Sequence, residues 1–379
     1  MIEPIKSQPV LFSVEKVGRF AVAKITINRP EVLNSMNSEC YRLIEAKLIE
    51  WATDDEIAAV VLAGAGEKSF CAGGDVKSLV IDGQKKGLDV AREFFTREYF
   101  VDSMIHNYSK PVIAFLDGIT MGGGLGFSVG ASHRIVTEKT LMAMPEISIG
   151  LFADVGATLF LKKLAGPFGV FMGLTGARIR ASEAIQIGLA DYFAPSNMKI
   201  KIAVDLLRLP WQGSPSIDRE IVTEYLKVSL NNHMQIERER DFHIINDAFS
   251  QVKCLSDVEA FFVDGAKIES PFINETLNRA QAGSWLSRAV FFEATRRHEL
   301  LTINETLQRE WQLALSFSAE PEFYEGVRAV LIDKDQSPKW RIKSCSEAEK
   351  VDLNWYFDYC QRTGETNLLT KKIREHTKK

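Results

Sequence analysis

Two glycine-rich stretches decide the fold: Phe70-Cys71-Ala72-Gly73-Gly74-Asp75 and, further along, Gly118-Ile119-Thr120-Met121-Gly122-Gly123-Gly124-Leu125-Gly126. Each stretch follows a short apolar run of strand length, residues 57–63 for the first and residues 112–116 for the second. Glycine lets a ligand approach the main chain closely, and two converging N–H groups can hold the oxyanion that forms on an acyl carbonyl. Either stretch alone could be a simple tight turn, but together they favour a site for acyl transfer.

Around these stretches, strand-like and helical patterns of apolar residues alternate. A strand-like pattern covers residues 20–28. Helical patterns cover residues 36–51, 90–105, 256–267 and 304–318. Strands alternating with helices are typical of an α/β fold built from crossover units. Beyond Pro195 no strand pattern stands out. We therefore predict an α/β core over residues 1–200 and a mostly helical C-terminal region, residues 201–379, that covers the active site.

The composition argues against several classes of function. The formal net charge of -4, without a basic stripe, does not suggest a nucleic-acid partner. No apolar run approaches the roughly 20 residues that a membrane-spanning helix needs. The five cysteines form no CxxC pair, and the six histidines show no spacing typical of metal ligands. We therefore expect neither a disulfide framework nor a metal site.

The expected location of the protein follows from its cysteines and its first residues. Scattered cysteines fit a reducing compartment. The stretch from Met1 to Phe12 contains neither an apolar signal core nor an Arg- and Ser-rich amphipathic helix. We expect a cytoplasmic protein, or a mitochondrial matrix protein if it is eukaryotic and processed.

Three acidic residues stand among apolar or aromatic neighbours. Glu146 and Asp154 lie in Met144-Pro145-Glu146-Ile147-Ser148-Ile149-Gly150-Leu151-Phe152-Ala153-Asp154, and Glu98 follows a phenylalanine pair on a predicted helix. Such surroundings raise the pKa of a carboxyl group toward values that suit acid–base chemistry. Glu146 and Asp154 are therefore candidate catalytic residues. Glu98 could equally pair with Arg97 or lie at the surface.

A serine nucleophile is the main competing motif. The segment from Gly126 to Gly130 matches the GxSxG pattern, with Ser128 at its centre. That elbow needs a strand leading directly into its first glycine, whereas the residues after Leu116 look like a loop. We therefore predict that Ser128 is an ordinary helix residue.

The ordered set of motifs resembles the crotonase (enoyl-CoA hydratase/isomerase) superfamily. The set comprises Asn28-Arg29-Pro30 with Asn34, then Phe70 to Asp75, then the glycine triplet 122–124, then Pro145-Glu146 with Gly150. The resemblance implies a ClpP-like crotonase fold of repeated ββα units with a helical C-terminal region. It also implies an acyl-CoA substrate. The N–H groups of Gly74 and Gly123 would form the oxyanion hole, and Glu98, Gly123, Glu146 and Asp154 would contact the substrate.

Within this superfamily the pattern is most similar to the 3-hydroxyisobutyryl-CoA hydrolases. The shared features are Arg97-Glu98-Tyr99, residues 119–124, Glu146 followed by Asp154, residues 325–329 and residues 333–340. The resemblance implies hydrolysis of a short 3-hydroxyacyl-CoA in valine catabolism, with Glu146 and Asp154 catalytic. It implies no cofactor, since coenzyme A is part of the substrate, and it leaves a homo-oligomer open.

Two other functions compete with hydrolysis on this fold. Hydratases of the superfamily usually have a second glutamate three residues after the middle glycine of the triplet, where this chain has Gly126. That difference argues against an enoyl-CoA hydratase or isomerase. A CoA-binding protein without activity is disfavoured because Glu146 and Asp154 are present. Ala153 replaces a usual proline, and residues 283–287 replace a segment rich in Ser, Pro and Thr, which leaves the preferred acyl group open.

Overall fold

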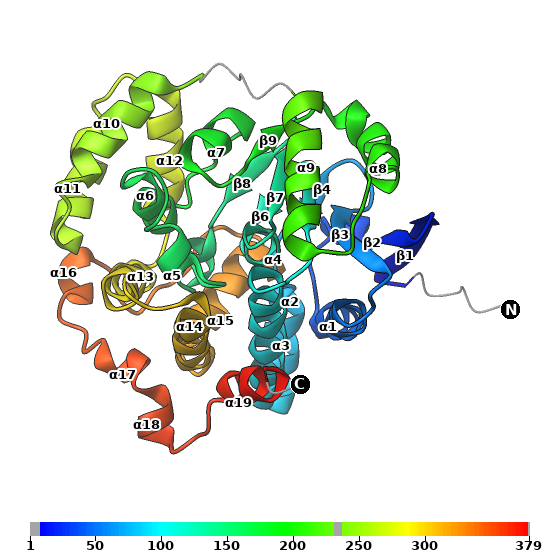
Figure 1. The fold of residues 1–379 in the computed structure, drawn as a ribbon. Helices are drawn as coiled ribbons and strands as arrows, with labels where there is room; N and C mark the ends of the chain where they lie inside the picture. The colour runs from blue at the N-terminus through cyan, green and yellow to red at the C-terminus, as the bar shows by residue number, and fades with distance from the viewer. Residues whose placement is uncertain (1–7, 231–236, 378–379) are drawn as a thin grey trace, which may run out of the picture.

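Two β-sheets surrounded by helices form the part of the chain that the computed structural model describes, residues 8–230 and 237–377 (Figure 1). The expected location was partly based on the stretch from Met1 to Phe12, and residues 1–7 of that stretch lie outside the described residues. The larger sheet has the strand order β1-β2-β3-β5-β7-β9, and the smaller has the order β4-β6-β8. The strands are β1 (Val10–Val17), β2 (Phe20–Ile27), β3 (Ile57–Gly64), β4 (Ser69–Cys71), β5 (Val112–Leu116), β6 (Ile119–Met121), β7 (His133–Val136), β8 (Leu141–Ala143) and β9 (Tyr192–Phe193).

From β3 to β9, consecutive strands alternate between the two sheets, which produces the predicted ββα repeat. Strands β3, β5 and β7 belong to the larger sheet, and β4, β6 and β8, which follow them in turn, belong to the smaller one. The neighbouring strands are parallel except for β1 and β2, which pair antiparallel. Because parallel strands end at the same edge of a sheet, the loops after β4 and β6 are brought side by side.

Helices separate these strand pairs. After β9, all regular secondary structure of the described chain is helical. The helices of the core are α1 (Ser38–Ala52), α2 (Val76–Lys86), α3 (Asp89–His106), α4 (Gly123–Val129), α5 (Ala157–Phe160), α6 (Phe168–Thr175) and α7 (Ala181–Ile187), with short turns η1 (Pro30–Val32) and η2 (Glu146–Ile149). Those after β9 are η3 (Ser196–Met198), α8 (Lys199–Leu207), α9 (Pro215–Ser229), α10 (Glu239–Phe249), α11 (Leu255–Gly265), α12 (Pro271–Gln281), α13 (Trp285–Arg297), α14 (Ile303–Ser318), α15 (Pro321–Val327), η4 (Arg328–Ile332), α16 (Cys345–Ala348), α17 (Asn354–Phe357), α18 (Tyr359–Thr363) and α19 (Leu368–His376). None of the described helices is both long and apolar enough to cross a bilayer.

Most elements predicted from the sequence are present. The predicted strands correspond to β2, β3 and β5, and the predicted helices to α1, α3, α11 and α14. The prediction of a loop after Leu116 was wrong, because β6 lies there between β4 and β8. A strand of three residues with glycine on both sides is too short to show an alternating pattern.

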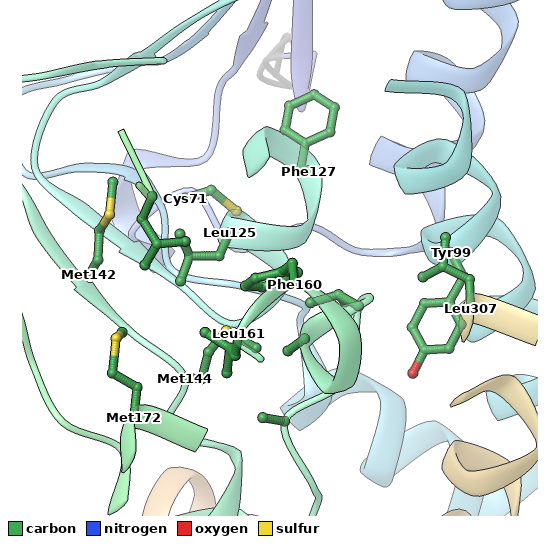
Figure 2. Packing of buried hydrophobic residues seen from close by; sticks show 14 of the residues in the cluster. Cys71, Tyr99, Leu125, Phe127, Met142, Met144, Phe160, Leu161, Met172 and Leu307 are labelled. Carbon is green, nitrogen blue, oxygen red and sulfur yellow. The ribbon is translucent and has the colours of Figure 1, made fainter. Parts of the chain in front are cut away.

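One hydrophobic core joins the two predicted parts of the chain. It extends from Val10 in β1 to Ile373 in α19. Figure 2 shows a portion of it, with Phe127 from α4, Tyr99 from α3 and Leu307 from α14. A second core lies on the opposite face of the larger sheet, where α8 and α9 pack against β2, β3 and β5. The division of the chain near residue 200 stays a prediction.

Candidate active site

All five predicted site residues line one cavity of about 590 Å³. They are Gly74, Glu98, Gly123, Glu146 and Asp154. The cavity is bounded by η1, the loop after β4, the start of α4, η2, and residues of η4 from the C-terminal region. Residues far apart in the sequence therefore meet as the motif pattern predicted.

The Asn28-Arg29-Pro30 motif shapes one wall of this cavity. Arg29 forms an ion pair of 3.0 Å with Asp75, and its Nη1 donates to the carbonyl of Ser35. Asn34 is fully buried, has a φ of 58°, and donates from its side chain to the carbonyls of Ala65 and Ser69. An asparagine tolerates this left-handed conformation better than most residues. The motif thus holds η1 against the loop after β4.

Two main-chain N–H groups are free at the centre of the cavity. A Cβ atom added to Gly123 would lie 3.1 Å from the nitrogen of Gly74 and would overlap Oε1 of Glu98. The two glycines therefore lie close together, and the close approach of Glu98 explains why residue 123 has no side chain. Neither N–H meets an acceptor among the residues that the structure describes. Both remain available to a ligand atom.

Glu146 begins η2 and projects over Gly122. Its side chain is buried, and a Cβ atom on Gly122 would lie 2.5 Å from its Oε1. Its Oε2 has no hydrogen-bond partner among the described residues. Burial, followed by the negative charge of Asp154, raises the pKa of Glu146 well above its ordinary value. A buried carboxyl group with a free oxygen facing a cavity suits proton transfer or attack on a carbonyl.

Glu98 and Asp154 are buried and each accepts a hydrogen bond from a tyrosine. The hydroxyl of Tyr41 donates to Glu98 at 2.5 Å, and that of Tyr99 donates to Asp154 at 2.5 Å. Burial, and then the charge of Asp154, raises the pKa of Glu98 to about 8, and burial raises the pKa of Asp154 to about 7. The alternative of a surface position or an Arg97 pair for Glu98 is wrong.

The sequence did not reveal the buried acid Asp102, one helical turn beyond Glu98 on α3. Neither oxygen of its carboxyl group has a partner in the described chain, and burial raises its pKa well above the ordinary range. A Cβ atom on Gly126 would lie 3.0 Å from Oδ2 of Asp102 and would overlap the side chain of Val155. Val155 and Asp102 therefore occupy the space that a side chain at position 126 would need. This is the position at which the sequence comparison with hydratases expects a second glutamate.

Val155 itself has an unusual backbone. Its φ of 53° is left-handed, which is rare for a β-branched residue and costs on the order of 1–3 kcal/mol. It directly follows Asp154, so this turn aims the Asp154 carboxyl group while Val155 packs against Gly126.

Introducing a glutamate at position 126 tests this crowding. We expect Gly126→Glu to lower the thermal unfolding midpoint and the hydrolytic activity, and not to confer crotonyl-CoA hydration, because Val155 and Asp102 occupy the space the new side chain needs. Differential scanning calorimetry, free-thiol release and enoyl absorbance would measure the unfolding midpoint, hydrolysis and hydration in turn. Gain of hydration in a variant of unchanged stability would contradict this account.

Ser128 is a helix residue, as predicted. It is fully buried in α4, and its hydroxyl donates to the carbonyl of Gly124 at 2.8 Å. The strand β6 ends before Gly122 and does not lead into Gly126. A hydroxyl committed to its own helix cannot act as a nucleophile in the cavity.

The unusual segment 283–287 does not line the cavity. Instead, the N–H of Ser284 donates to the carbonyl of Ile147 in η2 at 2.9 Å, and its hydroxyl donates to the buried Glu322. The segment therefore supports the turn that carries Glu146 from outside the cavity. The sequence pattern alone did not distinguish these two roles.

A family model described as enoyl-CoA hydratase/isomerase matches residues 22–357 of the chain. The chain belongs to this family. The predicted resemblance to the crotonase superfamily is thereby confirmed. Solved structures of two similar proteins share the fold. An enoyl-CoA hydratase from Rhodobacter sphaeroides has a TM-score of 0.77 and 30% identity, and a carnitinyl-CoA dehydratase from Mycobacterium thermoresistibile has a TM-score of 0.80 and 29% identity. Each match covers 93% of this chain and 96% of the other.

Curated relatives of the chain carry a more specific name. The mitochondrial 3-hydroxyisobutyryl-CoA hydrolase of Homo sapiens is 37% identical over 91% of this chain and 87% of its own length. The hydrolase of the same name from Danio rerio is 38% identical over 88% of this chain and 85% of its own length. The finer resemblance predicted from the sequence is therefore confirmed.

Proposed function

We propose that this protein hydrolyses a short 3-hydroxyacyl-CoA thioester, 3-hydroxyisobutyryl-CoA, to the free hydroxy acid and coenzyme A. The observation that carries the proposal is the meeting of two free N–H groups with the carboxyl groups of Glu146 and Asp154 in one cavity. The names of the relatives at 37–38% identity support the acyl group and a place in valine catabolism. Since coenzyme A enters as part of the substrate, the reaction needs no metal or redox cofactor.

The reaction would begin with the thioester carbonyl between the N–H groups of Gly74 and Gly123. Attack on the carbonyl carbon places negative charge on its oxygen, which both N–H groups stabilise. In one route Glu146 takes a proton from water as the water attacks, the carbon–sulfur bond breaks, and the proton passes to the CoA thiolate. In the other route Glu146 attacks the carbonyl carbon, and the carbon–sulfur bond breaks to release the CoA thiolate, which takes a proton from solvent. Water then cleaves the resulting anhydride, which frees the hydroxy acid and restores the Glu146 carboxylate. Both routes require Glu146 to be ionised.

We assign Glu98 and Asp154 different roles from their positions, because both line the cavity but Oε1 of Glu98 lies directly beside Gly123. With a pKa of about 8, Glu98 keeps its proton at neutral pH and so does not repel the oxyanion beside Gly123. Asp154, with a pKa of about 7, is the acid more readily ionised. It would accept a hydrogen bond from the 3-hydroxyl of the acyl group.

Hydration of an enoyl-CoA is the second candidate function, supported by the name of the Rhodobacter sphaeroides structure. Glycine at position 126 argues against it, since a two-glutamate mechanism lacks its second acid here. The deciding assay supplies 3-hydroxyisobutyryl-CoA and crotonyl-CoA separately and follows free thiol and enoyl absorbance together. Thiol release from the hydroxyacyl substrate with little change in enoyl absorbance supports hydrolysis. Loss of enoyl absorbance without thiol release would identify a hydratase, and neither change would identify a binding protein without activity.

The pH dependence of turnover tests the role of Glu146. We expect kcat/KM to increase with pH through the range above the ordinary carboxyl value, because Glu146 must lose its proton and its pKa is raised. Asp154→Asn removes a negative charge that contributes to this rise, so it should move the ascending limb to lower pH. Profiles of both proteins on isobutyryl-CoA, which lacks the hydroxyl, would show the shift. Movement of the limb to higher pH would contradict the assignment.

Of the two expected compartments, the relatives support the mitochondrial one. The names of the Homo sapiens and Danio rerio relatives include the word mitochondrial. Those names favour the mitochondrial matrix over the cytoplasm.

A further inference from the structure

The turn after Asp154 needs an external support. Val155 and Gly156 have φ values of 53° and 89°, so two consecutive residues are left-handed. A valine does not hold this conformation unaided, so surrounding contacts must fix it. The side chain of Val155 is confined by Gly126 on one side. The support for the main chain comes from a distant helix.

Glu310, fully buried on α14, binds the main chain of this turn. Its Oε2 accepts a hydrogen bond from the N–H of Gly156 at 2.5 Å. Its Oε1 accepts from the N–H of Thr158 at 3.1 Å and from the hydroxyl of Thr158 at 2.5 Å. Main-chain N–H groups that converge in this way form a concave site that a carboxyl group can occupy. Burial raises the pKa of Glu310 to about 8 in spite of these hydrogen bonds. The group that occupies it here belongs to the C-terminal region.

The network continues away from the cavity. The hydroxyl of Thr158 lies 2.8 Å from Nδ1 of His298, which is buried at the end of α13. The carbonyl of Asp154 accepts from the N–H of Ala157, which closes the turn on its other side. Glu310 does not line the cavity, whereas Asp154 does. Any effect of Glu310 on the substrate must therefore pass through the turn.

We propose that Glu310 is a positioning residue that fixes residues 154–158, so that helix α14 determines where Asp154 presents its carboxyl group to the acyl hydroxyl. The inference rests on the proposed function, in which Asp154 binds that hydroxyl. It assigns the C-terminal helices a part in substrate choice, in addition to covering the site. Loss of the Glu310 contacts would then impair recognition of the hydroxyl more than turnover of an acyl group that lacks it.

The test compares Glu310→Gln with Asp218→Asn. In the first variant the amide keeps one acceptor oxygen and turns an NH2 group toward an N–H or hydroxyl donor of the turn. The control residue, Asp218, is also a buried acid, and it accepts a hydrogen bond from the main-chain N–H of Gln212. It lies on α9, on the opposite face of the larger sheet. Hydrogen exchange by mass spectrometry measures protection of residues 154–158. The ratio of kcat/KM for 3-hydroxyisobutyryl-CoA to that for isobutyryl-CoA measures recognition of the hydroxyl.

For Glu310→Gln we expect faster exchange in this segment and a ratio lowered by about tenfold or more, with neither change in Asp218→Asn. Unchanged exchange, or faster exchange with the original ratio, would overturn the proposal. If Glu310→Gln does not fold, Thr158→Val removes a single donor and should give the same changes to a smaller degree. If the unsubstituted protein hydrolyses neither thioester, the proposed function fails, and the exchange data alone decide whether Glu310 holds the turn.

Discussion

Replacing Glu146 with glutamine should lower kcat for 3-hydroxyisobutyryl-CoA by about a hundred- to ten-thousandfold, which is the range for loss of a general acid–base group. The amide has nearly the same shape as the carboxyl group but can neither take a proton from water nor attack a carbonyl. Its contacts with Gly122 and the cavity remain, so the affinity for free coenzyme A should change little. Thiol release and calorimetric titration with coenzyme A measure the two quantities.

The same variant should fold normally. The carboxyl group of Glu146 is buried, and its Oε2 has no partner in the described chain, so its ionisation is unfavourable in the folded protein. We therefore expect the thermal unfolding midpoint of Glu146→Gln not to fall. The matched control is Glu31→Gln, an exposed acid that also lines the cavity and should keep normal turnover. Normal turnover in Glu146→Gln would remove Glu146 from the mechanism.

The residues that the sequence predicts for the candidate site line one cavity, and they could be chosen from the sequence because the main requirements of such a site are local. The glycines of the Phe70 to Asp75 segment and of the triplet show where the main chain must be open to a ligand. The apolar neighbours of Glu146 and Asp154 show that these acids are buried. Neither inference depends on how distant elements are arranged. The order of the motifs then identified the family, and with it the ββα repeat.

The partners of these acids could not be predicted in the same way. Tyr41 and Glu98, and likewise Tyr99 and Asp154, meet only because α1, α3 and the turn before α5 pack together. Helical spacing predicts which residues share a face, but it does not predict which face of another element they contact. Glu310 is a more extreme case, because it lies over one hundred and fifty residues from its partner Gly156. The contact between Glu310 and Gly156 forms only when the C-terminal region packs against the core.

Glu98 and Asp154 both line the cavity, and the proposed mechanism assigns recognition of the substrate hydroxyl to Asp154. Asp154→Asn should lower the preference for 3-hydroxyisobutyryl-CoA over isobutyryl-CoA by about a hundredfold or more, because a site built around a hydroxyl discriminates strongly against its absence. The amide can still accept from Tyr99, but it no longer offers an ionised oxygen to the substrate. Ratios of kcat/KM for the two thioesters measure the preference.

Glu98→Gln provides the comparison, since Glu98 is equally buried and also accepts from a tyrosine. Because the pKa of Glu98 is about 8, this acid is already neutral at pH 7, and a neutral amide should preserve most of the preference for the hydroxylated substrate. A greater loss of preference in Glu98→Gln than in Asp154→Asn would reverse the two roles. Equal losses would mean that the two acids bind the hydroxyl jointly, as expected if they share a proton across the cavity.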